Sequence, residues 1–229
     1  MEPIGTKQLG RYRSVPTFVN AHRKIRTEWY RFRMPSNARE RLLTAAERLF
    51  YEEGIRAVGV ERILSESGVG RASFYRHFPS KDDLVVEVLR RRDAAWRAWL
   101  ADTVDASPRG TGDLALALFD GLAERFAAAD FRGCAFINTM VEEADPSSPA
   151  HRVAAEHKEK VIDYLDGLLA AAGYRGHRTL AGQLALLGDG AIVAALRERT
   201  TDAAPRARTV AEALLATAER ADAPPLPGC

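Results

Sequence analysis

Apolar side chains recur every three or four residues along most of the chain, which is the spacing of helices that bury one face. The first clear stripe is formed by Leu42, Ala46, Leu49 and Phe50. Asn37 and Glu40 have the spacing of a capping box that starts this helix, and Gly54 is expected to end it in the left-handed conformation. Further stripes predict helices at about 60–66, 71–77, 81–103, 113–129, 133–144, 150–172, 178–199 and 205–221. Alternating β-branched runs are absent, so the sequence predicts an all-α protein.

Two of the predicted helices are short and are joined by a turn that contains glycine, Ser67-Gly68-Val69-Gly70. Gly68 can take a positive φ where the chain reverses, and Val69 is placed to fill the angle between the two helices. Ala72 is small where the helices must approach each other. This layout after a capped helix is typical of a DNA-binding helix-turn-helix.

Composition and charge narrow the class of protein. A hydrophobic fraction of 46% in 229 residues indicates a globular fold, and no run of eighteen apolar residues or secretory signal is present. Two isolated cysteines fit a reducing cytosol. Residues 1–33 carry a net charge of +6 and the remainder −4. Such a patch suits contact with a polyanion, although charge alone leaves open that it is a solvated surface.

The second short helix of the pair offers hydrogen-bonding side chains and no acid, which suits contact with DNA. The segment 63–84, ILSESGVGRASFYRHFPSKDDL, resembles the signature of the TetR family of transcription regulators, and the similarity extends over about 38–90. Its most specific part is Tyr75, His77, Phe78 and Lys81. The resemblance implies an N-terminal three-helix helix-turn-helix domain followed by a C-terminal helical domain that binds a ligand and forms a dimer.

The resemblance also implies roles for single residues. Tyr75, His77 and Lys81 are expected to bind DNA phosphates, with Lys81 aided by the positive end of its helix. Arg71, Ala72 and Ser73, at the start of the same helix as Tyr75, are expected to face base edges or nearby phosphates. The full expected DNA-binding set is Arg71, Ala72, Ser73, Tyr75, Arg76, His77 and Lys81.

This sequence departs from the family pattern at two helix starts. Gly59 and Gly70 stand where Thr and Ser are usual, which puts those helix caps and one phosphate contact in doubt. Glu61 and Glu66 would repel phosphate, so we expect both to face solvent.

The C-terminal half is expected to enclose a small apolar or aromatic ligand. The candidate lining residues are Phe119, Leu122, Phe126, Phe136, Asn138, Met140, Glu142, His157, Tyr164 and Asp189. The apolar members can equally be plain core. Asp189 lies in an apolar helix and needs a partner or water, either at a pocket or interface or in a core ion pair. The segment 132–138 with Glu142 resembles one group of these regulators.

Three other features leave alternatives open. Cys134 is either a redox-sensitive thiol beside Arg132 or a buried structural cysteine, and the second interpretation is favoured. His151 and His157 lie six residues apart on different helix faces, which argues against a metal site. Two stripes either form a homodimer interface or pack within the subunit: Leu180, Leu184, Leu187, Ala191, and Val210, Leu214, Thr217.

These observations predict a cytoplasmic, nucleoid-associated regulator that represses transcription from a palindromic double-stranded operator and is released by a ligand. A TetR-like protein that acts on the nucleoid or on cell division is the alternative. No G-x-S-x-G, P-loop, dinucleotide or zinc motif is present, so an enzyme is disfavoured and no cofactor or metal is expected.

The chain is divided at Pro- and Gly-containing segments. We expect a disordered basic tail at 1–36, the helix-turn-helix domain at 37–82, the C-terminal domain at 83–221 and a Pro-rich tail at 222–229. Met34 immediately precedes the capped helix, so one hypothesis places the natural start there. The alternative is a basic arm that reaches phosphates or a minor groove.

Overall fold

The structure is a computed structural model that describes residues 37–107 and 114–220. The expectations about the basic tail, the start at Met34, the linker near 108–112 and the Pro-rich tail lie outside these residues. The described residues form helices, with one isolated bridge between Tyr174 and Arg220, and this confirms the all-α prediction.

The first three helices are α1 (Ala38–Glu53), α2 (Val60–Ser67) and α3 (Arg71–His77). The Asn37 side chain accepts a hydrogen bond from the Glu40 amide at 2.7 Å, so the predicted N-cap is confirmed. The Glu40 carboxylate does not complete the capping box and instead pairs with Arg91. Gly54 follows α1 with φ +95° and ψ 152°, a positive φ outside the left-handed helical region that was expected.

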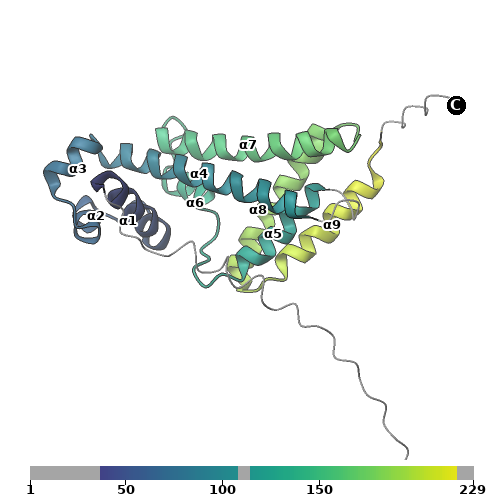
Figure 1. The fold of residues 1–229 in the computed structure, drawn as a ribbon. Helices are drawn as coiled ribbons and strands as arrows, with labels where there is room; N and C mark the ends of the chain where they lie inside the picture. The colour runs from purple at the N-terminus through teal and green to yellow at the C-terminus, as the bar shows by residue number, and fades with distance from the viewer. Residues whose placement is uncertain (1–36, 108–113, 221–229) are drawn as a thin grey trace, which may run out of the picture. The chain divides into compact units, whose positions relative to one another are not determined.

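Helix α4 (Lys81–Ala106) leads from the three short helices toward the C-terminal half (Figure 1). It begins at Ser80, whose hydroxyl accepts a hydrogen bond from the Asp83 amide at 3.1 Å. Leu84 and Val88 pack with α1 to α3, whereas Leu100 and Val104 pack into the C-terminal core. One helix therefore contributes to both hydrophobic cores.

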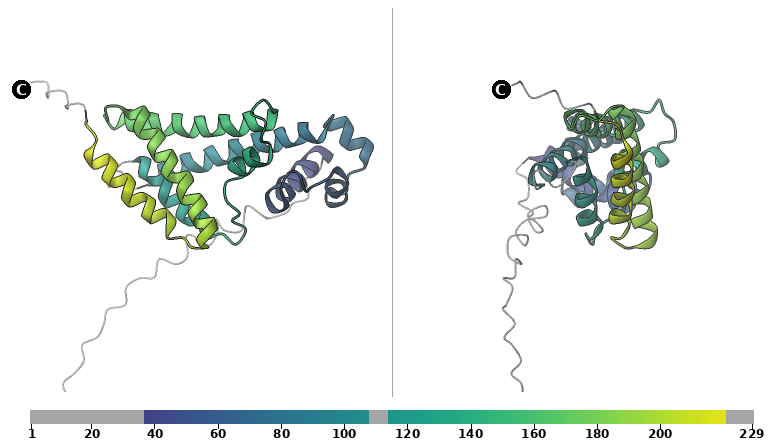
Figure 2. Two further views of the ribbon diagram at one scale, coloured as in Figure 1. Left: turned by 180° about the vertical axis from the view of Figure 1, so that it is seen from behind. Right: turned by 90° about the vertical axis from the view of Figure 1, so that its right-hand side faces the viewer.

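Within residues 114–220 the structure has five further helices and one 3₁₀ turn. They are the turn η2 (Leu114–Leu116), α5 (Ala117–Phe126), α6 (Ala135–Glu142), α7 (Pro149–Ala171), α8 (His177–Glu198) and α9 (Ala203–Thr217). Helix α7 lies along α4, and α8 crosses between α7 and α9 (Figures 1 and 2). Each predicted helix is found, although the region expected as one helix at 113–129 is divided between η2 and α5.

The two cores are not divided between the two halves of the sequence. The core beneath α1 to α3 includes Phe136 of α6 and Ala150, Val153 and Ala154 of α7. The second core is formed by α5, α8 and α9 with the far ends of α4 and α7. The core beneath α1 to α3 is thus completed by residues of α6 and α7, which lie more than fifty residues after α3 in the sequence.

Helix α8 has an apolar face that the subunit leaves exposed. By length and composition alone it could cross a membrane, which is weak evidence, and one third of the relevant window is buried. Leu184 and Ala191 are buried in the subunit core, so the stripe that contains them packs within the subunit, one of the two alternatives. The exposed apolar side chains are instead Leu186, Val193 and Leu196.

Candidate DNA-binding surface and ligand cavity

The turn between α2 and α3 has the geometry that its sequence predicts. Gly68 adopts φ 62° and ψ 28°, a left-handed conformation that glycine takes without strain. Val69, next in the chain, is buried between the helices, and Phe74 and Phe78 hold α3 against the core. The polar residues of α3 are therefore held on its outer surface.

Most of the residues expected to bind DNA lie on this outer surface. Tyr75 is 47% exposed although it is aromatic, and Ser73 is half-buried. The other exposed members are Arg71, Ala72, Arg76 and His77. Because Phe74 and Phe78 face the core from the same helix, the exposed residues form one face that can approach a DNA groove.

Lys81 is the exception in the expected set. Its ammonium donates a hydrogen bond to the Ile55 carbonyl and lies 6.0 Å from the centre of the Phe50 ring. It therefore joins the start of α4 to the turn between α1 and α2. A phosphate contact would have to use its remaining N–H donors.

The α2 surface agrees with the expected departures from the family pattern. Gly59 and Gly70 start α2 and α3 without any side-chain cap. Glu61 is exposed and pairs with Arg71, so an acidic residue holds one of the expected base-reading groups. Glu66 is also exposed and pairs with Arg48 and Arg62.

A cavity of about 280 Å³ lies among α4, α5, α6, α7 and α8. Four of the expected ligand residues line it: Leu122, Phe136, His157 and Asp189. A larger hollow of about 910 Å³ beside α1 and α6 is lined by Phe126, Asn138 and Glu142. Phe119, Met140 and Tyr164 line neither space. Phe119 and Tyr164 pack with the C-terminal core. Met140 packs with the core beneath α1 to α3, which is called the DNA-end core below.

Sequence reasoning missed Trp96, Cys134 and Lys158, which also line the 280 Å³ cavity. Trp96 lies in the helix expected at 81–103 and was not among the candidate lining residues. The available signal was its position along the predicted helix. Trp96 lies beyond the part of α4 that packs with α1 to α3 (the DNA-binding end), where α4 passes along the C-terminal half. Lys158 follows His157 directly and gave no separate signal.

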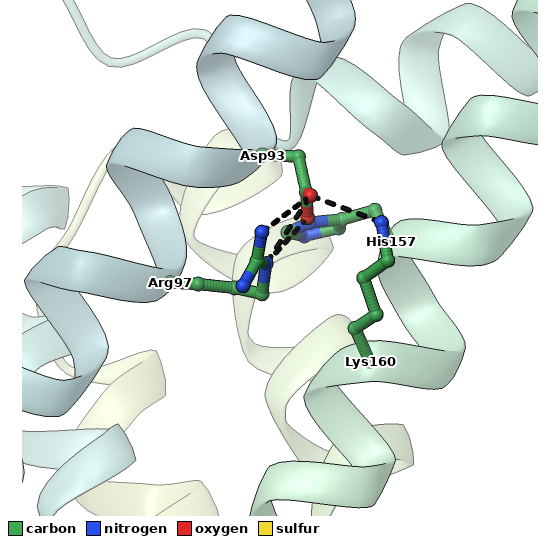
Figure 3. A network of polar contacts seen from close by, with 4 residues as sticks. All are labelled: Asp93, Arg97, His157 and Lys160. Atoms are coloured by element: carbon green, nitrogen blue, oxygen red, sulfur yellow. Dashed lines mark hydrogen bonds and ion pairs between the residues drawn. The ribbon is translucent and has the colours of Figure 1, made fainter.

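A polar network joins α4 to α7 beside this cavity (Figure 3), with Asp93 and His157 buried at its centre and the side chains of Arg97 and Lys160 reaching the surface. Asp93 accepts hydrogen bonds from His157 Nδ1 at 2.9 Å, from Arg97 at 3.1 to 3.2 Å and from Lys160 at 3.2 Å. Burial raises the pKa of Asp93, but these three donors lower it more, and the resulting pKa is about 2. The Asp93 carboxylate is therefore ionised at neutral pH.

His157 is neutral in the same network. Burial lowers its pKa to about 4, and the hydrogen bond to Asp93 offsets this only in part. The ring is 2% exposed, stacks on Phe136 at 3.6 Å between centroids and meets the edge of Trp96 at 5.0 Å. These contacts fix the ring plane at the cavity wall.

Asp189 forms an ion pair at the cavity wall. Its carboxylate accepts a hydrogen bond from Lys158, and both side chains line the cavity. Burial lowers the pKa of Lys158, but Cys134 and Asp189 raise it more, so its pKa is raised. The ammonium is therefore charged, and the pair is electrically balanced.

Three hydrogen bonds connect α6 and the segment just before it to α1 and to the turn after α1. The Tyr51 hydroxyl accepts a hydrogen bond from the Arg132 amide at 2.9 Å and donates one to the Gly133 carbonyl at 3.1 Å. At the other end of α6, the Glu142 carboxylate accepts a hydrogen bond from the Arg56 amide at 2.8 Å. A helix that borders the cavity is therefore bonded to the DNA-binding end.

No group of three or more His, Cys, Asp or Glu side chains within 37–107 and 114–220 could hold a metal ion. The His151 ring nitrogen lies 2.7 Å from the Glu143 carbonyl. Its partner is thus a backbone group, whereas His157 is held by Asp93.

Comparisons with known proteins agree with this geometry. Residues 42–88 match the model of "Bacterial regulatory proteins, tetR family". The chain is 37% identical over 71 residues to the transcriptional regulator LmrA of Bacillus subtilis, a match that covers 31% of this chain and 38% of that protein.

Solved structures cover more of the chain. SCO4454, a TetR-family regulator from Streptomyces coelicolor, is 35% identical with a TM-score of 0.73, over 80% of this chain and 96% of that one. Reduced E. coli NemR shares the fold at 23% identity, with a TM-score of 0.69 over 81% of this chain and 99% of that one. Sequence similarity at this level over nearly a whole relative, together with the helix-turn-helix, shows that the chain belongs to the TetR family of bacterial transcription regulators.

Proposed function

We propose that this protein is a cytoplasmic repressor that binds a near-palindromic operator as a homodimer and leaves it when a small ligand fills the 280 Å³ cavity. The observation that carries the proposal is the position of α6. Phe136, near its start, lines the cavity and also belongs to the core of the DNA-binding end. Glu142, at its end, bonds to the turn between α1 and α2.

The exposed face of α3 supports the DNA-binding part of the proposal. Tyr75 and His77 would contact phosphates, which position the protein without reading sequence. Arg71 has the donor geometry to read a guanine when it leaves Glu61. Arg76 adds a second exposed cation to the same helix.

The apolar faces of α8 and α9 support a homodimer. Val193 and Leu196 of α8 and Val210 of α9 are each about half exposed, which is unusual for large apolar side chains that face water. A second copy packed on this face would bury them. A two-fold dimer presents two equivalent recognition helices, which is why we expect a palindromic operator with half-sites about 34 Å apart.

Ligand release follows from linkage between the cavity and the DNA-binding end. A ligand that binds better to one position of α6 shifts the population toward that position. Movement of α6 would act on Arg56 through Glu142 and on α1 through Tyr51. The orientation of α2 and α3, and so the spacing of two recognition helices, changes with it.

Capture of genomic fragments by the purified protein tests this function. One or two near-palindromic sites beside promoters, with transcription in vitro reduced when the protein is added, would support a repressor. Many dispersed sites, with no effect on transcription, would support the alternative of a role in nucleoid organisation. The genes beside the sites would then suggest inducers to test for release.

A further inference from the structure

The 280 Å³ cavity contains one buried hydrogen-bonding group whose direction is fixed. His157 lines the cavity and is 2% exposed. Its Nδ1 is bonded to Asp93, and the described residues supply no hydrogen bond to the other ring nitrogen, Nε2. Since no fully buried side-chain nitrogen or oxygen among those residues lacks a partner, Nε2 retains some accessible surface, and the cavity is the space that His157 lines.

The Asp93 network decides what Nε2 can do. An ionised carboxylate only accepts hydrogen bonds, and Arg97 and Lys160 keep Asp93 ionised. His157 Nδ1 must therefore carry the proton that it donates to Asp93. In a neutral imidazole the second nitrogen is then an acceptor with a free lone pair.

The rest of the wall suits an apolar aromatic occupant. Phe136 stacks on the His157 ring and Trp96 packs nearly perpendicular to it, and most of the remaining lining is aliphatic or aromatic, which favours an aromatic ligand that can stack or pack edge to face. The four charged lining residues are all paired: Arg92 with Glu47, Arg125 with Asp130, and Lys158 with Asp189. The Arg92 and Arg125 pairs span 3.7 and 3.6 Å, and an ionised ligand would have to compete with these carboxylates for a counter-ion, whereas a neutral ligand leaves every pair in place.

We propose that the cavity binds a neutral, planar aromatic compound with a hydroxyl or N–H donor, and that this donor bonds to His157 Nε2. The phenol-type hydroxyl is the simplest example of this class. His157 is the binding residue, and Asp93 is a positioning residue that fixes its tautomer. The inference rests on the proposed function, because it names the ligand class of the same cavity.

Binding of four naphthalene probes of matched shape tests the proposal. Calorimetry at pH 7.5 would compare 2-naphthol, a donor, with 2-methylnaphthalene, 2-methoxynaphthalene and 2-naphthoate. We expect 2-naphthol to bind about tenfold more tightly than the methyl and methoxy probes, the value of about one hydrogen bond, and 2-naphthoate to bind weakest. Equal affinities, tightest binding by 2-naphthoate, or no binding by any probe would overturn the proposal.

Two variants assign the preference to His157 and its tautomer. His157→Phe keeps the stacking on Phe136 but removes the acceptor, so it should bind 2-naphthol and 2-methylnaphthalene equally. Asp93→Asn permits a proton on Nε2, because an amide can accept or donate, and should reduce the preference for 2-naphthol. If either variant keeps the tenfold preference, His157 does not receive the donor.

Nitrogen NMR of the wild-type protein gives a readout that does not depend on variant folding. The His157 signals should show an unprotonated Nε2, which shifts with 2-naphthol and not with 2-methylnaphthalene. A protonated Nε2 in the free protein would contradict the proposal. Release from operator DNA is measured separately. Selective binding of 2-naphthol without release would refute the proposed function and leave the ligand class intact. Release by 2-methylnaphthalene alone would support the proposed function and refute the ligand class.

Discussion

The DNA-binding end and the cavity of this molecule use polar side chains in opposite ways. On α3 most of the polar residues are exposed, and the 22 consecutive residues from 63 to 84 are enough to place them. At the cavity the decisive polar contact joins Asp93 and His157, which are 64 residues apart and almost fully buried. The difference shows that the surface of a single short helix can be predicted from local sequence, whereas the polar contacts at a cavity depend on long-range packing.

The largest expected effect comes from breaking the buried network. Asp93→Ala should lower the free energy of unfolding by about 3 kcal/mol, because it leaves His157 without its hydrogen bond inside the core. Urea unfolding measures this. Asp102→Ala, on an exposed part of the same helix, should change stability by less than about 0.5 kcal/mol. Equal losses would mean that the network does not stabilise the fold.

The second effect is a pH dependence of the free energy of unfolding, which arises at the cavity from His157. The pKa of His157 falls from its ordinary value to about 4 on folding, so the unfolded chain binds the proton first as the pH decreases. Stability is therefore retained above about pH 6.5 and lost as pH falls toward 4. Between pH 7 and 5 the wild type should lose about 2 kcal/mol more than His157→Gln. Parallel pH profiles would contradict this.

At the DNA-binding end, substitutions should act on affinity and leave stability nearly unchanged. Arg71→Ala should relax the preference at one base pair in each half-site by about 1–3 kcal/mol if the contact is bidentate. Tyr75→Phe should instead weaken all sequences about equally. Selection from randomised operators separates the two. An unchanged base preference in Arg71→Ala would remove Arg71 from sequence reading.

Loss of one contact should uncouple the two ends. Glu142→Gln retains an acceptor for the Arg56 amide but not its charge, so we expect the ligand's effect on operator affinity to fall by about 1 kcal/mol. Glu143→Gln, at the adjacent position, is the matched control. Fluorescence anisotropy with labelled operator measures both variants with and without inducer. The coupling role fails if both respond as the wild type does.

The smallest expected effect is a gain. Glu61→Gln releases Arg71 and removes a negative charge from the surface that approaches DNA. Because the pair is exposed, the gain in affinity should be below about 1 kcal/mol. The fall of log affinity with log salt should become steeper, since Arg71 then neutralises a phosphate more often. A flatter slope would show that Glu61 instead orients Arg71 for DNA.

The sequence was informative wherever structure depends on neighbours in the chain. The cap at Asn37, the turn at Gly68 and the approximate bounds of most helices follow from local spacing, and the structure confirms them. His157 was recognised as a polar candidate, but its partner was not, because no pattern in α4 indicates which residue meets α7. Lys81 was assigned only to phosphate, since its bond to the Ile55 carbonyl arises from tertiary packing.

Under the proposed function, Phe136 limits how this regulator can change its ligand during evolution. The same ring packs under the DNA-binding helices, lines the cavity and supports His157. A substitution there that admits a new compound would also disturb the packing beneath the DNA-binding helices α1 to α3, so selection would act against it. New specificities are more accessible through Leu118, Ile162 and Ala185, which line the cavity from α5, α7 and α8 without belonging to the DNA-end core. Comparison of natural variants should therefore find diversity on those walls and constancy at position 136.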